Sequence, residues 1–234
     1  MIDKVKEKVT ELLQDDNSGH GMDHINRVLN LSLKFALEEK ADIELVSLIA
    51  LLHDVDDRKL FGIESSNNLT NTKRIMDECG VLETVQKKVI CELERIGYSK
   101  RLYGLSPQTL EGKIVSDADM CDALGTHAIL RVYAYDMSKK RPFFDRDVFP
   151  MEEVNKDVYK TEGSKTGICH IFEKVLRLKN MMLTDSGYKE SLERHEFVVN
   201  FLYHFFEEEN ANQWILYLKE FLDNHKEEKS FKKL

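Results

Sequence analysis

Histidine and aspartate side chains in three separate segments of this 234-residue chain are of the types that bind metal ions. Imidazole and carboxylate ligands together suit Mn²⁺, Fe²⁺, Co²⁺, Ni²⁺ or Zn²⁺, whereas Ca²⁺ prefers oxygen ligands alone. Four such ligands on an octahedral ion leave positions for water and substrate, and the ion can then orient a phosphate oxygen and lower the pKa of the water. The candidate ligands are His24, His53, Asp54 and Asp117.

Each candidate ligand also has an ordinary structural explanation. A lone histidine on an apolar helix is more often a hydrogen-bonded core residue, and an aspartate after a serine, such as Asp117, is more often a helix cap. These explanations fit the combination poorly, because buried His and Asp side chains are costly unless they are paired or bound to metal. His53 and Asp54 directly follow the apolar run Leu45–Leu52, so the pattern favours a metal site.

Helices are the elements that must position these side chains. Apolar residues recur at helical spacing in long stretches, and the whole chain has only three prolines. His24 lies on the apolar stripe of a predicted helix that continues to residue 36. The stretch 42–53 is apolar almost all round, as is typical of a buried central helix, and Asp117 falls in a helical stretch over residues 114–135. No segment combines the alternating pattern and the turn residues that predict β-strands.

The fold class that this pattern predicts is all-α, a single-domain helical bundle of about ten helices with an irregular excursion near residues 139–161. The domain is expected to span residues 1–225, and the basic residues 226–234 are expected to form a frayed tail. Polar loops are predicted for residues 56–68 and 97–106. Further helices are predicted near residues 2–13, 69–76, 81–96, 164–183, 188–208 and 211–225.

Composition narrows the class of protein. A formal net charge of −8 argues against a dedicated nucleic-acid binder, which usually has a basic face. No apolar run reaches the roughly 18 residues of a membrane span, and the first residues lack the apolar core of a signal peptide, so a cytoplasmic location is expected. The four cysteines form no Cys-x-x-Cys pair, which makes a thiolate zinc site an unfavoured interpretation.

Three motifs together make the chain similar to the HD-domain superfamily of metal-dependent phosphohydrolases. The motifs are Gly19-His20-x-x-x-His24-x-x-Arg27-Val28, Ala50-Leu51-Leu52-His53-Asp54, and Val115-Ser116-Asp117-Ala118-Asp119-x-x-Asp122-Ala123-Leu124-Gly125. The segments Arg141–Asp145 and His170–Leu178 resemble the small bacterial single-domain branch of that superfamily, some of whose members hydrolyse nucleotides. The likeness extends from about His20 to Phe205 and so covers most of the chain.

The resemblance implies which residues bind the metal. Carried over to this sequence, the H…HD…D pattern of the family selects the same four ligands, His24, His53, Asp54 and Asp117. The resemblance favours one Mn²⁺ ion, with Mg²⁺, Co²⁺, Ni²⁺, Fe²⁺ or Zn²⁺ as other candidates, because a mixed N/O site accepts several divalent ions. Asp122 is expected to orient a ligand histidine, since a metal-bound imidazole needs an acceptor for its other N–H group.

Two further residues are candidates for proton transfer. Related enzymes place an acidic residue at the position of Asp57, where it can act as general base for the attacking water or orient that water. The alternative is an ordinary solvated charged loop. His20 lies four positions before His24 and can bind phosphate or donate a proton, or it can be an exposed residue near the start of the helix.

Basic and aromatic side chains are the candidates for substrate binding. Arg27 can pair with a phosphate, hold Asp54 in place, or form a surface salt bridge. Aromatic residues of the excursion can form a lid or stack on a base, although core packing is the commoner role. The basic candidates for phosphate binding are Arg27, Lys59, Lys165, His170 and Lys174, and the aromatic residues are Tyr133, Tyr135, Phe143, Phe144 and Phe149.

The predicted function is hydrolysis of nucleoside or deoxynucleoside triphosphates, or of related small phosphoesters, by attack of metal-activated water on phosphorus. The alternative is a metal-containing protein that binds a nucleotide or metabolite with little turnover. The presence of both Asp57 and His20 favours the enzyme. The expected partner is a small phosphorylated substrate, not a nucleic-acid polymer or a membrane, and the chain is expected to act as a monomer or homodimer.

Overall fold

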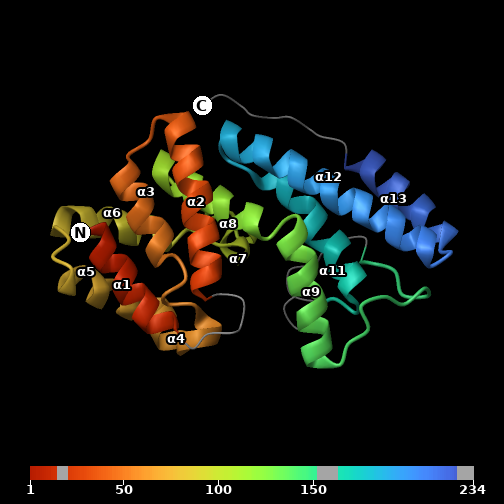
Figure 1. Cartoon of the computed structure of the whole chain (residues 1–234), viewed down its shortest axis with the longest axis horizontal. Helices are drawn as coiled ribbons and strands as arrows, with labels where there is room; N and C mark the ends of the chain where they lie inside the picture. Colours follow the sequence, from red (N-terminus) through yellow and green to blue (C-terminus); the bar gives the residue numbers. More distant parts are fainter. Residues whose placement is uncertain (15–20, 152–162, 226–234) are drawn as a thin grey trace. The chain divides into compact units, whose positions relative to one another are not determined.

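The computed structural model describes residues 1–14, 21–151 and 163–225 of the chain, and every regular element in these ranges is helical (Figure 1). The predicted all-α class is therefore confirmed. The helices group into two compact units. The first unit comprises Met1–Ala123 and Met182–Glu190, and the second comprises Leu124–Met181 and Ser191–Leu234. No described helix is both long and apolar enough to cross a membrane.

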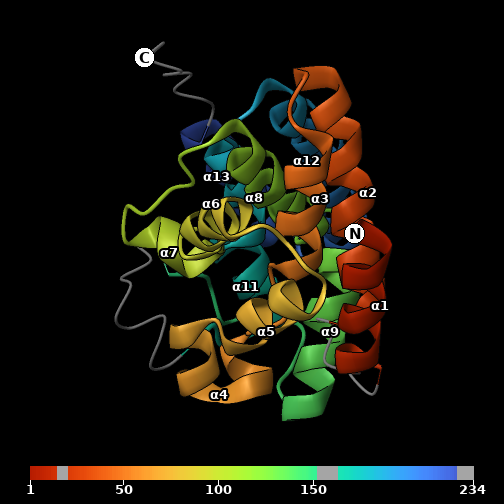
Figure 2. The same ribbon diagram turned by 90° about the vertical axis from the view of Figure 1, so that its left-hand side faces the viewer.

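The first unit is built around a buried central helix. Its helices are α1 (Ile2–Leu13), α2 (Met22–Glu39), α3 (Ile43–Leu52), α4 (Arg58–Asn68), α5 (Thr70–Glu78), α6 (Glu83–Leu93), α7 (Tyr98–Leu102), α8 (Leu110–Asp122) and the start of α12 (Asp185–Glu208). α3 packs against α1, α2, α6 and α8, and α2 lies beside it in both views (Figures 1 and 2). This arrangement places the carboxyl end of α3 next to the first turn of α2.

Local sequence explains why α3 and α2 form where they do. The Asp42 side chain caps α3 by accepting hydrogen bonds from the backbone N–H groups of Glu44 and Leu45. All side chains from Leu45 to Leu52 are buried, as the continuous apolar run predicts. In α2 the buried positions recur at helical spacing and include His24, so this histidine faces the core of the first unit.

Two predicted loops of the first unit contain helices. The polar stretch 56–68 includes α4, which begins at an Asp57 cap and is interrupted at Gly62, where φ is 82°. α4 buries none of its residues, so it has no apolar stripe that a periodicity argument can detect. The stretch 97–106 likewise contains the five-residue helix α7. The predicted helix over 114–135 is divided into α8 and α9 at Gly125, where φ is 88°.

The second unit has an aromatic core. Its elements are α9 (Thr126–Lys139), α11 (Gly167–Glu173), the 3₁₀ helix η1 (Val175–Met181), the remainder of α12, and α13 (Asn212–Asn224). Phe149 stacks on Trp214 with ring centroids 4.4 Å apart, and the Phe144 ring contacts Trp214 edge-on at 5.4 Å. These two half-buried aromatic residues of the excursion therefore pack against the buried Trp214. Positions 152–162 of the excursion and the predicted tail 226–234 lie outside the described residues.

Candidate metal centre

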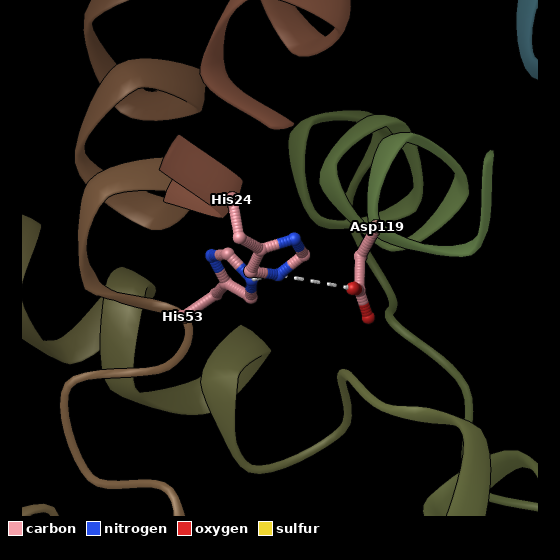
Figure 3. Close-up of side chains that lie close together, drawn as sticks. All are labelled: His24, His53 and Asp119. Carbon is pink, nitrogen blue, oxygen red and sulfur yellow. Dashed lines mark hydrogen bonds and ion pairs between the residues drawn. The ribbon is translucent and has the colours of Figure 1, made fainter. Parts of the chain in front are cut away.

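Four side chains of the first unit converge beside the ends of α2, α3 and α8. His24 Nε2 lies 3.1 Å from His53 Nε2, 3.4 Å from Asp54 Oδ2 and 3.6 Å from Asp119 Oδ1. Figure 3 shows both imidazole rings and the Asp119 carboxylate directed toward one another. Ligand atoms bound at about 2.0–2.2 Å to a shared ion lie roughly 3–4 Å from each other. The spacing of these donors therefore fits one divalent ion, and His24, His53 and Asp119 form a group that can hold it.

Hydrogen bonds set which nitrogen of each histidine faces the centre. His53 Nδ1 donates to the backbone oxygen of Ala50 at 2.8 Å, and His24 Nδ1 donates to Asp122 Oδ2 at 2.7 Å. A carbonyl and an ionised carboxylate can only accept, so both Nδ1 atoms carry the proton and both Nε2 atoms present a lone pair. Two lone pairs facing each other at 3.1 Å repel unless a proton or a cation lies between them. This arrangement suits a metal ion.

The electrostatics of His24 point in the same direction. Burial by itself lowers the pKa of this imidazole, but hydrogen bonds with Asp122 and Asp54 and the charge of Asp119 outweigh it and raise the pKa to about 9. The surrounding carboxylates thus favour a positive charge at this position. A divalent cation supplies that charge when it replaces the proton.

Asp122 links the centre to Arg27. Its carboxylate is fully buried and accepts hydrogen bonds from Arg27 Nε at 2.7 Å and Arg27 Nη2 at 3.1 Å, in addition to the bond from His24. Asp122 thus orients the His24 ring, as expected, and Arg27 in turn neutralises and holds Asp122. Of the roles considered for Arg27, the structure places its guanidinium on Asp122 and not on Asp54.

The α8 carboxylate that lies beside His24 and His53 is that of Asp119, whereas the predicted ligand Asp117 lies on another face of the helix. Successive residues of an α-helix are rotated by about 100°, so Asp117 and Asp119 point about 200° apart, whereas Asp119 and Asp122 share a face. Asp117 instead accepts hydrogen bonds from the backbone N–H groups of Leu183 and Thr184 and from the Thr184 hydroxyl. Burial raises the pKa of Asp117 to about 7, although these donors act in the opposite direction. The signal in the sequence that could have indicated Asp119 is its spacing from Asp122, which places both carboxylates on one face of α8.

Asp57 lies one turn beyond Asp54, at the start of α4. Its Oδ1 accepts the backbone N–H of Lys59 at 2.9 Å, so it caps the helix, and its side chain is half-buried. Lys59 is exposed in the first turn of α4. The neighbouring Asp56 is buried and accepts three hydrogen bonds, from Ser65 Oγ and from the backbone N–H groups of residues 71 and 72. Asp57 is therefore the carboxylate of this pair that solvent can reach.

The remaining candidates are placed by the structure in other ways. Lys165, His170 and Lys174 belong to the second unit, so their participation at the metal centre stays a prediction. Lys165 is exposed, whereas His170 is half-buried with Nδ1 3.4 Å from Ser164 Oγ, and Lys174 follows it one turn later. His20 lies outside the described residues.

Comparisons with known proteins show which family the part of the chain around this centre resembles. The model of the HD domain family matches residues 21–124, a range that contains every residue of the centre. YpgQ of Bacillus subtilis (strain 168) is 30% identical over 204 residues, which is 86% of this chain and 89% of YpgQ.

Solved structures extend the likeness to most of the chain. An HD-superfamily hydrolase from Bacillus thuringiensis is 29% identical with a TM-score of 0.70, and a protein from Lactobacillus plantarum is 27% identical with a TM-score of 0.77. Both comparisons cover 90% of this chain and 97% of the other. The crystal structure of B. subtilis YpgQ in complex with ADP has a TM-score of 0.66 at 26% identity, and covers 88% of this chain and 94% of that one.

Proposed function

We propose that this chain, which belongs to the HD-domain superfamily of metal-dependent phosphohydrolases, hydrolyses a nucleoside or deoxynucleoside triphosphate or a related small phosphoester. The observation that carries the proposal is the pair of Nε2 atoms of His24 and His53, which face each other at 3.1 Å among carboxylates. This donor set, two imidazole nitrogens among carboxylates, is one that suits a divalent ion.

We assign the metal ligands as His24, His53, Asp54 and Asp119, with Asp119 in place of Asp117. The ion we favour is Mn²⁺. A divalent ion at this position supplies Lewis acidity, since it lowers the pKa of a coordinated water and offsets the charge of phosphate oxygens. Asp122 and Arg27 keep the His24 ring in the orientation that directs Nε2 toward the ion.

Asp57 is the proposed general base. Its half-buried carboxylate lies one turn beyond Asp54, close in sequence to the ligands, and an ionised carboxylate there can take a proton from an attacking water. Lys59, two residues after Asp57, can contact a phosphate oxygen. For His20 we keep the proposal of phosphate binding or proton donation.

A nucleotide is the substrate class that the relatives favour. The structure of YpgQ with ADP is the supporting observation, and it concerns that protein. For this chain, Lys165, His170 and Lys174 stay the residues that we propose for phosphate binding. A triphosphate attacked at the α-phosphorus would yield pyrophosphate, and a monophosphate would yield inorganic phosphate.

The experiment is a turnover screen. Purified protein is incubated with each nucleoside and deoxynucleoside triphosphate and monophosphate, separately with Mn²⁺, Mg²⁺, Co²⁺, Ni²⁺, Fe²⁺ and Zn²⁺, and products are separated by chromatography. We expect Mn²⁺-dependent cleavage that is lost in Asp54→Ala, whose metal content should fall in elemental analysis. Tight nucleotide binding without turnover under any condition would contradict the enzyme and favour the binding protein. Full metal occupancy in Asp54→Ala would contradict the ligand assignment.

A further inference from the structure

The segment Met182–Glu190, here called the return segment, comes back to the first unit after an excursion of the chain through the second. It contains the start of α12. Its described hydrogen bonds reach both α2, which carries His24, and α8, which carries Asp119 and Asp122. Two of the three helices that position the metal centre are thus held by the same short stretch of chain.

The contact between the return segment and α8 is buried, and its close approach depends on a glycine in the return segment. Asp117 is fully buried, and its Oδ2 accepts from Leu183 N at 2.9 Å, Thr184 N at 2.8 Å and Thr184 Oγ1 at 2.7 Å. One turn later on the same face, Cys121 Sγ lies 3.7 Å from the Gly187 backbone oxygen. A Cβ at position 187 would lie only 2.5 Å from Asp117 Oδ2 and 2.6 Å from its Cβ. Glycine therefore allows the return segment to approach α8 this closely.

The contact with α2 is formed at the far end of that helix from His24. Glu39, the last residue of α2, accepts the backbone N–H of Ser186 at 2.9 Å, and Lys34 Nζ lies 2.7 Å from Glu190 Oε2. Bonds to α8 and to α2 therefore alternate along nine residues of chain. Any shift of one helix relative to the other must strain or break some of these bonds.

We propose that the return segment is a clamp that sets the spacing between α2 and α8, and that Asp117 is the positioning residue through which it acts on the metal ligands. The inference rests on the proposed metal centre. Asp117 lies two residues from Asp119 on a continuous helix, so a displacement at one is passed to the other. The donors of His24 and Asp119 must stay within a few tenths of an ångström of their positions to share one ion.

Coupling of this kind is reciprocal. If the clamp strengthens metal binding, then metal binding must strengthen the clamp by the same factor, and couplings between sites in proteins typically amount to about 5–150-fold. The backbone N–H groups of Leu183 and Thr184, which donate to Asp117, should therefore exchange with deuterium more slowly when metal is bound. Those amides do not touch the ion, so slowing beyond that of a reference amide in the second unit, such as the Met151 N–H that donates to Glu173, reports coupling through α8 and not general stabilisation.

The test uses the full chain with Co²⁺ or Mn²⁺ as the probe. Metal affinity is measured by calorimetry, ligand geometry by the visible absorption of bound Co²⁺, and amide exchange over residues 182–190 with and without metal. The variants are Asp117→Asn and Gly187→Ala, the second of which keeps every donor and acceptor of the clamp. The matched control is Glu173→Gln, which alters another buried carboxylate that accepts a backbone N–H and a serine hydroxyl, in the second unit.

We expect both clamp variants to bind metal about tenfold more weakly with a changed Co²⁺ spectrum, and the control to match wild type. In wild type, metal should slow exchange of residues 183 and 184 by a similar factor. Unchanged affinity and spectrum in both folded variants, or exchange in wild type that metal does not slow, would overturn the clamp. If Asp117→Asn does not fold, the metal affinity of Gly187→Ala and the amide exchange of wild type test the proposal. Wild-type protein that binds neither metal overturns the proposed metal centre itself.

Discussion

One face of α8 directs Asp119 and Asp122 toward His24, whereas the opposite face directs Asp117 toward the return segment. The three residues are of one type and lie within six positions of the same helix. The Asp119 side chain is 26% exposed, while Asp117 is fully buried and its oxygens accept hydrogen bonds from backbone and hydroxyl donors. The difference teaches that the direction of a side chain, more than its residue type, determines whether it can take part in metal chemistry.

The histidines extend this comparison to the second unit. His24 and His195 are both buried, yet their pKa values shift in opposite directions. Burial and the nearby charge of Lys179 lower the pKa of His195 to about 4, whereas the carboxylates around His24 overcome the effect of burial and raise its pKa to about 9. A buried imidazole beside carboxylates can exchange its proton for a cation, and one beside a lysine remains neutral.

Variants that remove or neutralise one carboxylate on each face of α8 test whether the two faces differ in metal binding. Asp119→Ala deletes a proposed ligand, so we expect loss of bound metal and of metal-dependent turnover. Asp117→Asn should retain metal, although more weakly. Elemental analysis of both purified variants measures this. Equal metal content in Asp119→Ala and wild type would mean that the two faces do not differ as we propose.

Asp122→Asn tests the support of a ligand without removing the ligand. The substitution weakens the acceptor for His24 Nδ1 and the pairing with Arg27, and changes of this kind typically cost about 10–100-fold in metal affinity or activity. Calorimetric titration with Mn²⁺ gives the affinity. Arg27→Lys is the companion variant, and we expect a smaller loss because lysine keeps the charge but not the paired hydrogen bonds. A larger loss of metal affinity in Arg27→Lys than in Asp122→Asn would contradict the proposal that Arg27 acts on His24 through Asp122.

The lowered pKa of His195 predicts a pH dependence of stability. Because His195 has a pKa of about 4 when folded and an ordinary value of 6.5 when unfolded, the unfolded chain binds more protons between these values. Stability contributed by neutral His195 is therefore complete above pH 6.5 and falls as the pH decreases, by about 2 kcal/mol at pH 5.

Urea unfolding of wild type and His195→Gln from pH 8 to pH 5 measures the contribution of His195 to the free energy of unfolding. The variant should lose less stability than wild type over that range. Parallel curves for the two proteins would show that His195 does not titrate as described.

The smallest expected effect concerns the exposed part of the clamp. Lys34→Ala removes an ion pair with Glu190 in which the lysine side chain is 55% exposed, and such pairs contribute about 0.2–1 kcal/mol. We expect a small loss of stability that 1 M salt abolishes, with metal affinity nearly unchanged. Chemical unfolding at low and high salt provides the measurement. A loss as large as that of Asp117→Asn would place the main contact of the clamp on α2 instead of α8.

Much of the fold could be predicted from local patterns. The continuous apolar run ending at His53 and the Asp42 cap are enough to specify α3, because they act within one helix. The stripe containing His24 similarly predicts α2. α4 escaped prediction because it buries no residue, so its Asp57 cap was the only local signal. Local patterns could not predict how the helices group into two compact units either, since each unit combines segments that are distant in sequence.

The candidate site likewise has residues that local patterns could identify and residues that they could not. His24, His53 and Asp54 could be named from residue type and motif alone, and helical phase was sufficient to prefer Asp119 over Asp117 had it been applied within α8. The partners of Asp117 lie 66 and 67 positions away, and Arg27 lies 95 positions from Asp122. Such pairings depend on packing between helices, which no local pattern encodes.

Residue types and spacing within a helix were therefore enough to predict the all-α class and to name His24 and His53, which belong to a group of side chains that could hold a metal ion. Only the packed structure shows that Arg27 pairs with Asp122 and that Asp117 holds the return segment. The physical reason is that a buried carboxylate must find hydrogen-bond donors wherever the fold brings them. Those donors come from chain segments whose proximity only the packed molecule establishes.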